Sequence, residues 1–366
     1  MSAAALDSVR RLPRRGVLLV IGLVVASIAA SVGAVMALAH GTAAPTPTAT
    51  PIVTGAIGSG VVLIDTDLAY QGAAAAGTGM VLTSSGKVLT NNHVISGATT
   101  IKVVDPKTGH SYKARVVGYD RTADVALLQL QGASDLKTVS ISSANLSVGA
   151  SVTARGNAGG DGKISSATGT VTGLGKSITA SDDTGGSEHL TGLIETNAGV
   201  QPGDSGGPLV NSQGQVVGMD TAASSRFVFQ DISTTDAYAV PIAKARTIAD
   251  AISSGEASPT VHIGKTAFLG IAAGSVDTPG YGYGGQVASA SGALIVGVVS
   301  RGPAASASLV AGDVITAING RTVSSPSSIS AVVLAKKPGA KIKVAYVDQS
   351  GAGYTASVTL GSGPAQ

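Results

Sequence analysis

The stretch ETNAGVQPGDSGGPLVNSQGQVVGMDT, residues 195–221, surrounds one serine, Ser205, with glycine, proline and aspartate. These residue types tolerate turn conformations, so a tight connection between two strands is one interpretation. The other interpretation is chemical. A serine hydroxyl becomes an effective nucleophile when a neighbouring base removes its proton and a third group orients that base. The sequence must then supply a histidine and a carboxylate.

His93 is the histidine best placed to be the base. It follows the strand-like run KVLT in TNNHVISGA, where a side chain can point into a cleft. The other histidines border the apolar N-terminal segment or lie in the linker or in polar loops: His40, His262, His110 and His189. Asp124 directly precedes the apolar run VALLQL, whereas Asp105 and Asp120 lie in predicted turns. The chain order His93, Asp124, Ser205 is that of the chymotrypsin-like triad.

Three segments, LTNNHVI, ADVALLQL and GVQPGDSGGPLVNSQGQVVGMDT, resemble the catalytic segments of the HtrA (DegP-like) serine proteases. YAVPI resembles the end of that family's protease domain, and the similarity covers most of residues 75–255. The resemblance implies that Ser205 is the nucleophile, His93 the general base and then acid, and Asp124 the orienting carboxylate. It also implies that the backbone N–H groups of Gly203 and Ser205 form the oxyanion hole.

Asp204 departs from the family pattern, which usually has asparagine just before the nucleophile. In trypsin-like enzymes made as zymogens, an aspartate here pairs with a newly cut N-terminus. Such a pairing would require cleavage near residue 52, so a local hydrogen-bonding role is the preferred interpretation.

Substrate preference can be read in part from the residues around the serine. Gly199 lies six residues before Ser205, where trypsin-like enzymes that select Arg or Lys carry an acid. By resemblance, Val200 and Met219 line the substrate pocket. These residues predict small or medium aliphatic side chains at the cleaved position rather than basic ones.

A second domain is indicated by AFLGI, residues 267–271, and by VVSRGPAASASLVAGDVITAINGRTV, which resemble a PDZ domain. In such a domain a ligand's C-terminal strand joins a sheet edge while backbone N–H groups hold its carboxylate. Phe268, Leu269, Gly270 and Ile271 match that loop and edge strand. Gly312, Asp313 and Asn319-Gly320 are predicted to form turns.

Short apolar runs separated by turn residues, together with 50 glycines, predict an all-β first domain over residues 53–256. The resemblance implies two six-stranded β-barrels of the chymotrypsin type. An amphipathic helix over 241–255 closes this domain, with one apolar face: Ile242, Ala245, Ile248, Ala249 and Ile252. A linker over 257–266 precedes a small α+β PDZ domain over 267–362, with a helix near 324–335.

The N-terminal region contains 23 uncharged residues, 17–39, enough to span a membrane as a helix. Arginines in the tail, residues 1–16, predict a cytoplasmic N-terminus, a single transmembrane anchor, a Pro/Thr-rich stalk over 40–52 and extracytoplasmic domains. A cleaved signal peptide is the alternative, because Ala37-Leu38-Ala39 resembles a cleavage site.

Composition narrows the remaining function classes. Beyond the first sixteen residues, the 20 basic and 20 acidic side chains cancel, so no electrostatic footprint for nucleic acid is present. The sequence has no cysteine and no metal-ligand spacing, and we expect neither a metal nor a cofactor.

The predicted function is an extracytoplasmic serine endopeptidase that acts on misfolded or specific exported proteins. The alternatives are a non-catalytic peptide-binding or chaperone-like PDZ scaffold and a maturation protease with a single substrate.

The family often forms trimers through aromatic residues near the start of the protease domain. This region of the chain offers only Tyr70, so a homotrimer is carried over from the resemblance rather than read from the residues.

Overall fold

The computed structural model describes residues 59–182, 187–221, 227–229, 236–276 and 291–366. The predicted anchor or signal at 17–39, the tail and the stalk lie outside these residues. Among the described residues, no helix combines the length and the apolar character needed to cross a membrane.

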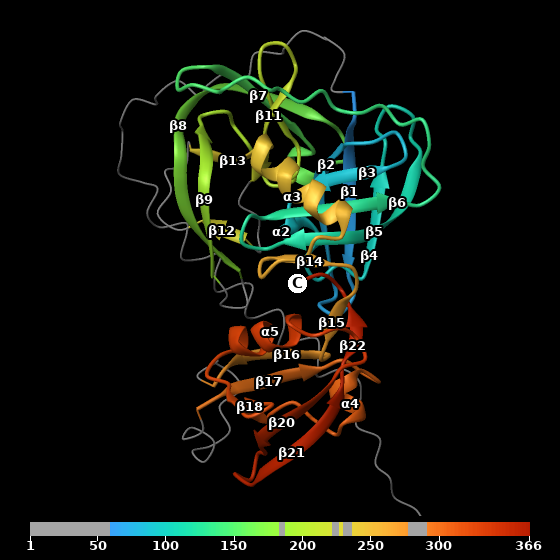
Figure 1. Ribbon diagram of the computed structural model, residues 1–366, viewed down its shortest axis with the longest axis vertical. Helices are drawn as coiled ribbons and strands as arrows, with labels where there is room; N and C mark the ends of the chain where they lie inside the picture. The colour runs from blue at the N-terminus through green and yellow to red at the C-terminus, as the bar shows by residue number, and fades with distance from the viewer. Residues whose placement is uncertain (1–58, 183–186, 222–226, 230–235, 277–290) are drawn as a thin grey trace, which may run out of the picture. The chain divides into compact units, whose positions relative to one another are not determined.

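The first sheet of the first domain closes on itself (Figure 1). Its strands are β1 (Val61–Leu68), β2 (Ala73–Val81), β3 (Lys87–Thr90), β4 (Thr100–Val104), β5 (Ser111–Asp120) and β6 (Val125–Leu130), with β14 (Val261–Ile263) at one end. Because β5 pairs with both β4 and β6, the strands β5-β4-β1-β2-β3-β6 form a closed six-stranded barrel. The prediction of an all-β first domain that contains a six-stranded barrel is thereby confirmed.

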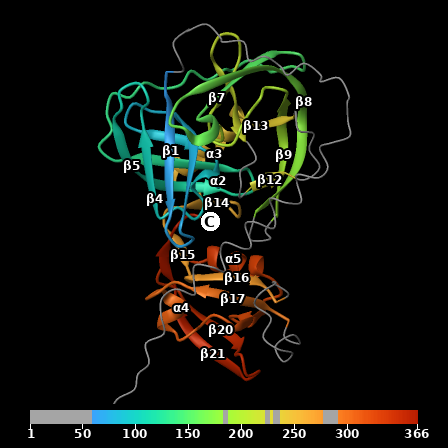
Figure 2. The same ribbon diagram turned by 180° about the vertical axis from the view of Figure 1, so that it is seen from behind.

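The second sheet follows along the chain and is drawn in green and yellow in Figures 1 and 2. Its strands are β7 (Ser151–Gly156), β8 (Ser165–Asp182), β9 (Ser187–Thr196), β10 (Pro208–Val210), β11 (Val216–Thr221), β12 (Phe227–Phe229) and β13 (Ala237–Pro241). They are ordered β12-β8-β7-β10-β11-β13-β9, and β8 also pairs with β9. The loop between β9 and β10 carries Ser205.

Strand β6 shows how the period of two builds two cores at once. Val125 and Leu127 belong to a cluster that also contains Val210, Val216 and Met219 of the second sheet. The alternate residues of β6 pack inside the first barrel: Ala126, Leu128 and Leu130. A strand buried on both faces reads as a continuous apolar run, which is what VALLQL shows.

The helix α3 (Ile242–Ser254) covers the core that both sheets share. Its buried face is formed by Ile242, Ala245, Ala249 and Ile252, and Ile248 packs against the same cluster. The helix begins after Pro241 and ends at Gly255, whose φ of 76° is a left-handed C-terminal cap. The predicted helix over 241–255 is therefore confirmed.

Residues 257–266 differ from their prediction as a plain linker. Val261–Ile263 forms β14 and pairs with β5, and the ring of His262 stacks on Tyr119 at 4.9 Å. Burial lowers the pKa of His262, with a hydrogen bond to the Lys265 carbonyl opposing the decrease. Three residues are too few for a periodic signal, so this strand could not be recognised from the residue pattern.

The second domain has a sheet of β16 (Ile271–Ser275), β17 (Ala293–Val298), β18 (Val314–Ile318), β19 (Arg321–Thr322), β20 (Lys341–Val347) and β21 (Gly353–Thr359). A smaller sheet pairs β15 (Thr266–Phe268) with β22 (Gly361–Gly363). Two helices complete it: α4 (Pro303–Ser306) and α5 (Pro326–Leu334). Figure 1 shows α5 alongside β16 and β17, and its buried residues Ile329, Val332 and Val333 join the domain's core. The predicted helix near 324–335 is present, and so are the turns at Gly312 and Asn319-Gly320, which have positive φ.

Candidate active site

His93 and Asp124 lie in two different connections of the first barrel. His93 lies between β3 and β4, Asp124 lies between β5 and β6, and the two side chains meet. His93 lies in α2 (Asn92–Ile95), a single helical turn that starts two residues after β3 ends, rather than at the strand end itself. Its backbone N–H donates to Asp124 Oδ1 at 3.0 Å, and its Nδ1 lies 2.9 Å from Asp124 Oδ2. Since a carboxylate only accepts, the proton of the neutral ring resides on Nδ1, and Nε2 carries the lone pair a base needs.

Asp124 is held in place from several sides. It is fully buried and has a φ of 53°, an uncommon value for a residue other than glycine. Its backbone carbonyl accepts from Asn91 Nδ2 at 2.9 Å, and its Oδ2 accepts from Thr221 Oγ1 at 3.1 Å. Thr221 ends β11, so a residue of the second sheet completes the environment of an aspartate from the first. Sequence reasoning missed Asn91 and Thr221.

Ser205 lies beside strand β2 and close to α2. Its backbone carbonyl accepts from Thr78 N at 2.9 Å. A Cβ placed on the preceding residue, Gly77, would lie 2.6 Å from Val94 Cγ1 and 3.4 Å from Ser205 O. Gly77 is therefore the point at which α2 and the serine loop both come close to β2, and the absence of a side chain makes room for them.

The glycines around Ser205 are required by close backbone contacts. Gly203 has a φ of 99°, and a Cβ there would lie 2.0 Å from Asn157 O. Gly206 has a φ of 84°, and a Cβ there would lie 2.2 Å from Thr78 O. No L side chain fits either position without moving the backbone. The turn interpretation of the motif is therefore correct, and the same turn fixes the shape of the predicted oxyanion loop.

Buried threonines connect this loop to the first barrel. Thr78 Oγ1 donates to Gly203 O at 2.7 Å and accepts from Asn157 N at 2.9 Å. Thr90 Oγ1 in turn donates to Thr78 O at 2.7 Å. Thr78 and Thr90 are 0% exposed. In the sequence, the signal for Thr78 and Thr90 is that they are polar residues within strands. The sequence does not show which loop these threonines contact.

Asp204 makes the local hydrogen bond that was the preferred interpretation of this residue. Its Oδ2 accepts from the backbone N–H of Gln201 at 2.9 Å. Burial raises the pKa of Asp204 to about 6, and the hydrogen bond from Gln201 opposes that increase.

Comparison with known proteins agrees with this geometry. Residues 77–219 match the trypsin-like peptidase domain, and residues 267–359 match the PDZ domain. The serine protease PepD of Mycobacterium tuberculosis is 34% identical over 320 residues, which are 82% of this chain and 63% of that protein. The chain belongs to the HtrA (DegP-like) family of serine proteases.

Other relatives carry the same kind of name. The periplasmic pH-dependent serine endoprotease DegQ of Escherichia coli is 32% identical, over 78% of this chain and 59% of its own length. The probable periplasmic serine endoprotease DegP-like of Pseudomonas fulva is 33% identical, over 79% and 56%. A solved structure, the HtrA-type protease AlgW with tripeptide, is 25% identical and covers 84% of this chain with a TM-score of 0.46. The chain spans between 56% and 63% of the length of these three curated relatives.

The predicted substrate pocket of this HtrA-family chain is not assembled as expected. Met219 is 0% exposed and belongs to the core shared by the two sheets, whereas Val200 packs against a different apolar cluster. Successive strand residues point to opposite faces, so placing Met219 in the core turns Asp220 the other way. Met219 as a pocket residue is therefore wrong. Gly199, by contrast, has open space beside it, since a Cβ added there would meet Ala167 Cβ as its nearest atom, at 4.0 Å.

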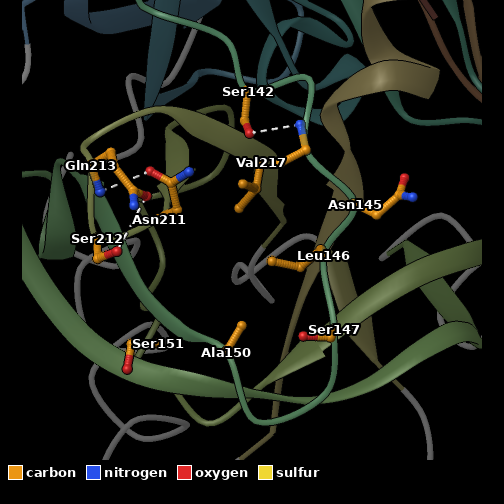
Figure 3. Close-up of a pocket in the computed structure, with 11 residues that line it drawn as sticks. Ser142, Asn145, Leu146, Ser147, Ala150, Ser151, Asn211, Ser212, Gln213 and Val217 are labelled. Carbon is orange, nitrogen blue, oxygen red and sulfur yellow. Dashed lines mark hydrogen bonds between the residues drawn. The ribbon is translucent and has the colours of Figure 1, made fainter.

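A separate depression of about 400 Å³ lies among the residues shown in Figure 3. Leu146 and Val217 supply apolar surface, and the rest of the lining comes from Ser142, Ala144, Asn145, Ser147, Ala150, Ser151, Asn211, Ser212 and Gln213. Every lining residue is neutral, so this hollow contains no carboxylate, histidine or lysine that could act as a general acid or base.

The predicted peptide-binding residues of the PDZ domain surround the start of β16. Leu269 is buried in the domain core, and its carbonyl accepts from Ala304 N at 3.0 Å. Gly270 has a φ of 80°, and Ile271 begins β16, which lies at one end of the described sheet. The ring of Phe268 stacks on Tyr70 with centroids 5.3 Å apart.

Proposed function

We propose that this chain is an extracytoplasmic serine endopeptidase that hydrolyses misfolded or specific exported proteins through an acyl-enzyme at Ser205. The observation that carries the proposal is the pair of hydrogen bonds, 3.0 and 2.9 Å long, that fix His93 on the fully buried Asp124. The names of the curated relatives and the trypsin-like domain support the same activity.

In this mechanism Ser205 Oγ attacks the scissile carbonyl carbon while His93 Nε2 takes the hydroxyl proton. Asp124 stabilises the resulting imidazolium through Nδ1. The negative oxygen of the tetrahedral intermediate accepts hydrogen bonds from the backbone N–H groups of Gly203 and Ser205. Collapse breaks the C–N bond, and the leaving amine takes the proton from His93. Water, deprotonated by His93, then attacks the acyl carbon. Collapse of this second tetrahedral intermediate breaks the bond to Ser205 Oγ, which takes the proton back from His93, and the carboxylic acid product is released.

The test is labelling of the ectodomain with a fluorophosphonate probe, comparing the wild type with Ser205→Ala. We expect labelling of the wild type and none of the variant, with cleavage of an unfolded protein lost in parallel. Peptide binding that persists in both proteins, with no labelling of a folded wild type, would favour the non-catalytic scaffold. A substrate survey separates broad quality control from maturation of a single protein.

The PDZ domain is proposed to bind C-terminal peptides, with the N–H groups of Leu269 and Gly270 on the carboxylate and the ligand strand along β16. Backbone groups cannot be removed by substitution, so the control is placed on the ligand. We expect a peptide with a free hydrophobic C-terminus to bind at least tenfold more tightly than its C-terminal amide. Equal affinity would contradict the proposed carboxylate site.

We make three further proposals, on the second sheet, the N-terminal segment and the oligomeric state. The second sheet is the second barrel of a chymotrypsin-like pair, and the additional pairing of β8 with β9 supports this. Residues 17–39 anchor the protein in the membrane with its domains outside, which carbonate extraction and protease accessibility of intact cells would test. The protein forms a homotrimer, which light scattering of the ectodomain would test.

A further inference from the structure

Two carboxyl groups are buried beside the nucleophile, and the mechanism above uses neither. Asp204 directly precedes Ser205, and Asp220 lies in β11 directly before Thr221. Asp204 is 3% exposed and Asp220 is 0% exposed. A buried carboxylate normally has a positive neighbour or several hydrogen-bond donors, because desolvating an unpaired charge is costly.

These two side chains have almost no such partners. Asp204 Oδ2 accepts from Gln201, but within the described residues Asp204 Oδ1 and both carboxyl oxygens of Asp220 have no hydrogen-bond partner. If one carboxyl group keeps its proton, its O–H can donate to the other, and two of the three unpartnered oxygens are satisfied. A pair with one proton therefore fits the site better than a pair of carboxylates.

The surrounding backbone holds the two residues together. Gly206 N donates to Asp220 O at 2.9 Å, and Asp220 N donates to Gly207 O at 2.8 Å. On the facing strand β7, a Cβ on Gly156 would lie 2.6 Å from Asp204 Oδ1. The backbone N–H of the adjacent Arg155 lies near the Asp220 carboxyl group and opposes the rise of its pKa, although the contact does not meet the geometry of a hydrogen bond. Neighbouring residues of β7 thus lie close to both carboxyl groups.

Electrostatics agree with this arrangement. Burial raises the pKa of Asp220 well above its usual value, and the nearby charge of Asp204 raises it further. The pKa of Asp204 is raised to about 6 by burial. Both shifts favour the protonated forms, and repulsion between the two carboxylates opposes their ionising together.

Few other titratable groups face the pair. The residues that approach it from β2 and β3, Thr78 and Thr90, do not titrate. β7 contributes Arg155, and Thr221 connects β11 to the Asp124–His93 pair. Other titratable residues on adjoining elements do not face the pair. Tyr238 donates to Glu195, and Asp161 and Lys163 are exposed to solvent.

We propose that Asp220 keeps one proton, donates it to Asp204 Oδ1, and by this hydrogen bond positions the Gly203–Gly206 loop for binding the oxyanion. The inference deepens the proposed protease function and rests on it. Both aspartates are positioning residues, since neither touches the substrate. When Asp220 ionises at high pH, two like charges face each other next to the nucleophile, the loop shifts, and kcat falls. At low pH both acids are neutral and the loop keeps its shape.

The experiment compares kcat and KM across pH for variants that keep or remove the donor. Asp220→Ala removes it and leaves Asp204 charged and unpaired, so we expect kcat to fall at least tenfold with KM changed less than threefold. Asp220→Asn replaces the O–H donor with an amide N–H and should retain at least a third of kcat without the decline at high pH. Combining Asp220→Ala with Asp204→Asn removes the unpaired charge and should recover at least threefold over Asp220→Ala alone.

Two results would overturn the inference. One is equal loss in Asp220→Ala and Asp220→Asn, and the other is a double variant whose defect is the product of the single defects. Asp120→Asn is the matched control, because Asp120 is also buried but lies at the end of β5, where it accepts from Thr122 and Thr260. It measures the effect of losing a buried carboxylate elsewhere, and its pH profile should match that of the wild type.

A second readout does not depend on activity. With carboxyl-labelled aspartate, wild-type protein at pH 7.5 should show the infrared band of one protonated carboxyl group, and Asp220→Asn should lack it. A wild type without this band contradicts the shared proton even if every variant is inactive. A wild type that shows the band but never reacts with the fluorophosphonate contradicts the protease function instead.

Discussion

Asp124 and Asp220 are both completely buried near the loop that carries Ser205, but they differ in the number of hydrogen-bond donors around them. The carboxylate of Asp124 accepts from the backbone and ring of His93 and from Thr221. Asp220, one residue before Thr221, has no hydrogen-bond partner for either carboxyl oxygen in the described part of the chain. One site is built to hold a negative charge and the other is not. The difference shows that burial alone does not determine the charge of a group, since the donors around it decide.

The largest expected effect comes from replacing Asp124, the carboxylate that accepts hydrogen bonds from His93 and Thr221. Asp124→Asn presents an amide N–H to His93 and favours the wrong tautomer of the ring, so kcat should fall about 10⁴-fold while the fold persists. Steady-state kinetics with a peptide substrate measure this. A loss below tenfold would mean that Asp124 does not orient the base.

The second largest effect is expected from a substitution in the Gly203–Gly206 loop. Gly203→Ala forces a Cβ against Asn157 O, at 2.0 Å in the present backbone, and the loop must move. Loss of one oxyanion donor lowers kcat by about 10²- to 10³-fold. The rate of fluorophosphonate labelling should fall with it. Gly214→Ala is the control, because its added Cβ meets no atom within 4 Å although its φ is also positive.

A smaller effect is expected from Thr221→Val, which removes one donor from Asp124 and keeps the shape of the side chain. A hydrogen bond to a charged group contributes about 1.5 to 3 kcal/mol, which corresponds to a loss of roughly 10- to 100-fold in kcat. Thr168→Val, at an exposed position of β8, should leave kcat unchanged. Equal kinetics for the two variants would show that Thr221 does not support the triad.

The smallest effect concerns stability rather than rate. The pKa of Asp204 is raised in the folded state to about 6, so protonation favours folding. The contribution is present below the unfolded value near 4 and is lost as pH rises through about 6. Relative to Asp204→Asn, the wild type should therefore lose about 2 to 3 kcal/mol of unfolding free energy between pH 4 and pH 7. Urea titrations at several pH values measure this, and a difference that does not vary with pH would contradict it.

The sequence predicted the elements and the residues of the triad more fully than it predicted their supports. VALLQL, KVLT and the 241–255 segment have patterns that local physics imposes, and the Ser205 motif has an unusual concentration of glycine. Thr78, Thr90 and Thr221 carry no such mark, because their role depends on register between strands far apart in the chain. Thr221 lies 97 residues from the aspartate it supports.

Met219 shows a second limit. In β11 every residue from Val216 to Thr221 is buried, so no alternation of polar and apolar residues indicates which side chains face the core. Only the pairing of β11 with its neighbours assigns Met219 to the core and Asp220 to the loop side. The short β14 was missed for a related reason, since three residues cannot show a period.

The threonine contacts of the serine loop have a consequence for the conditions in which the enzyme works. Thr78 and Thr90 connect the loop to the barrel through neutral hydroxyl and backbone groups that are 0% exposed. Dissolved ions weaken interactions between exposed charges, but they barely affect buried neutral hydrogen bonds. The rate of reaction with an uncharged probe should therefore stay nearly constant from dilute buffer to molar salt, as the proposed extracytoplasmic location would require.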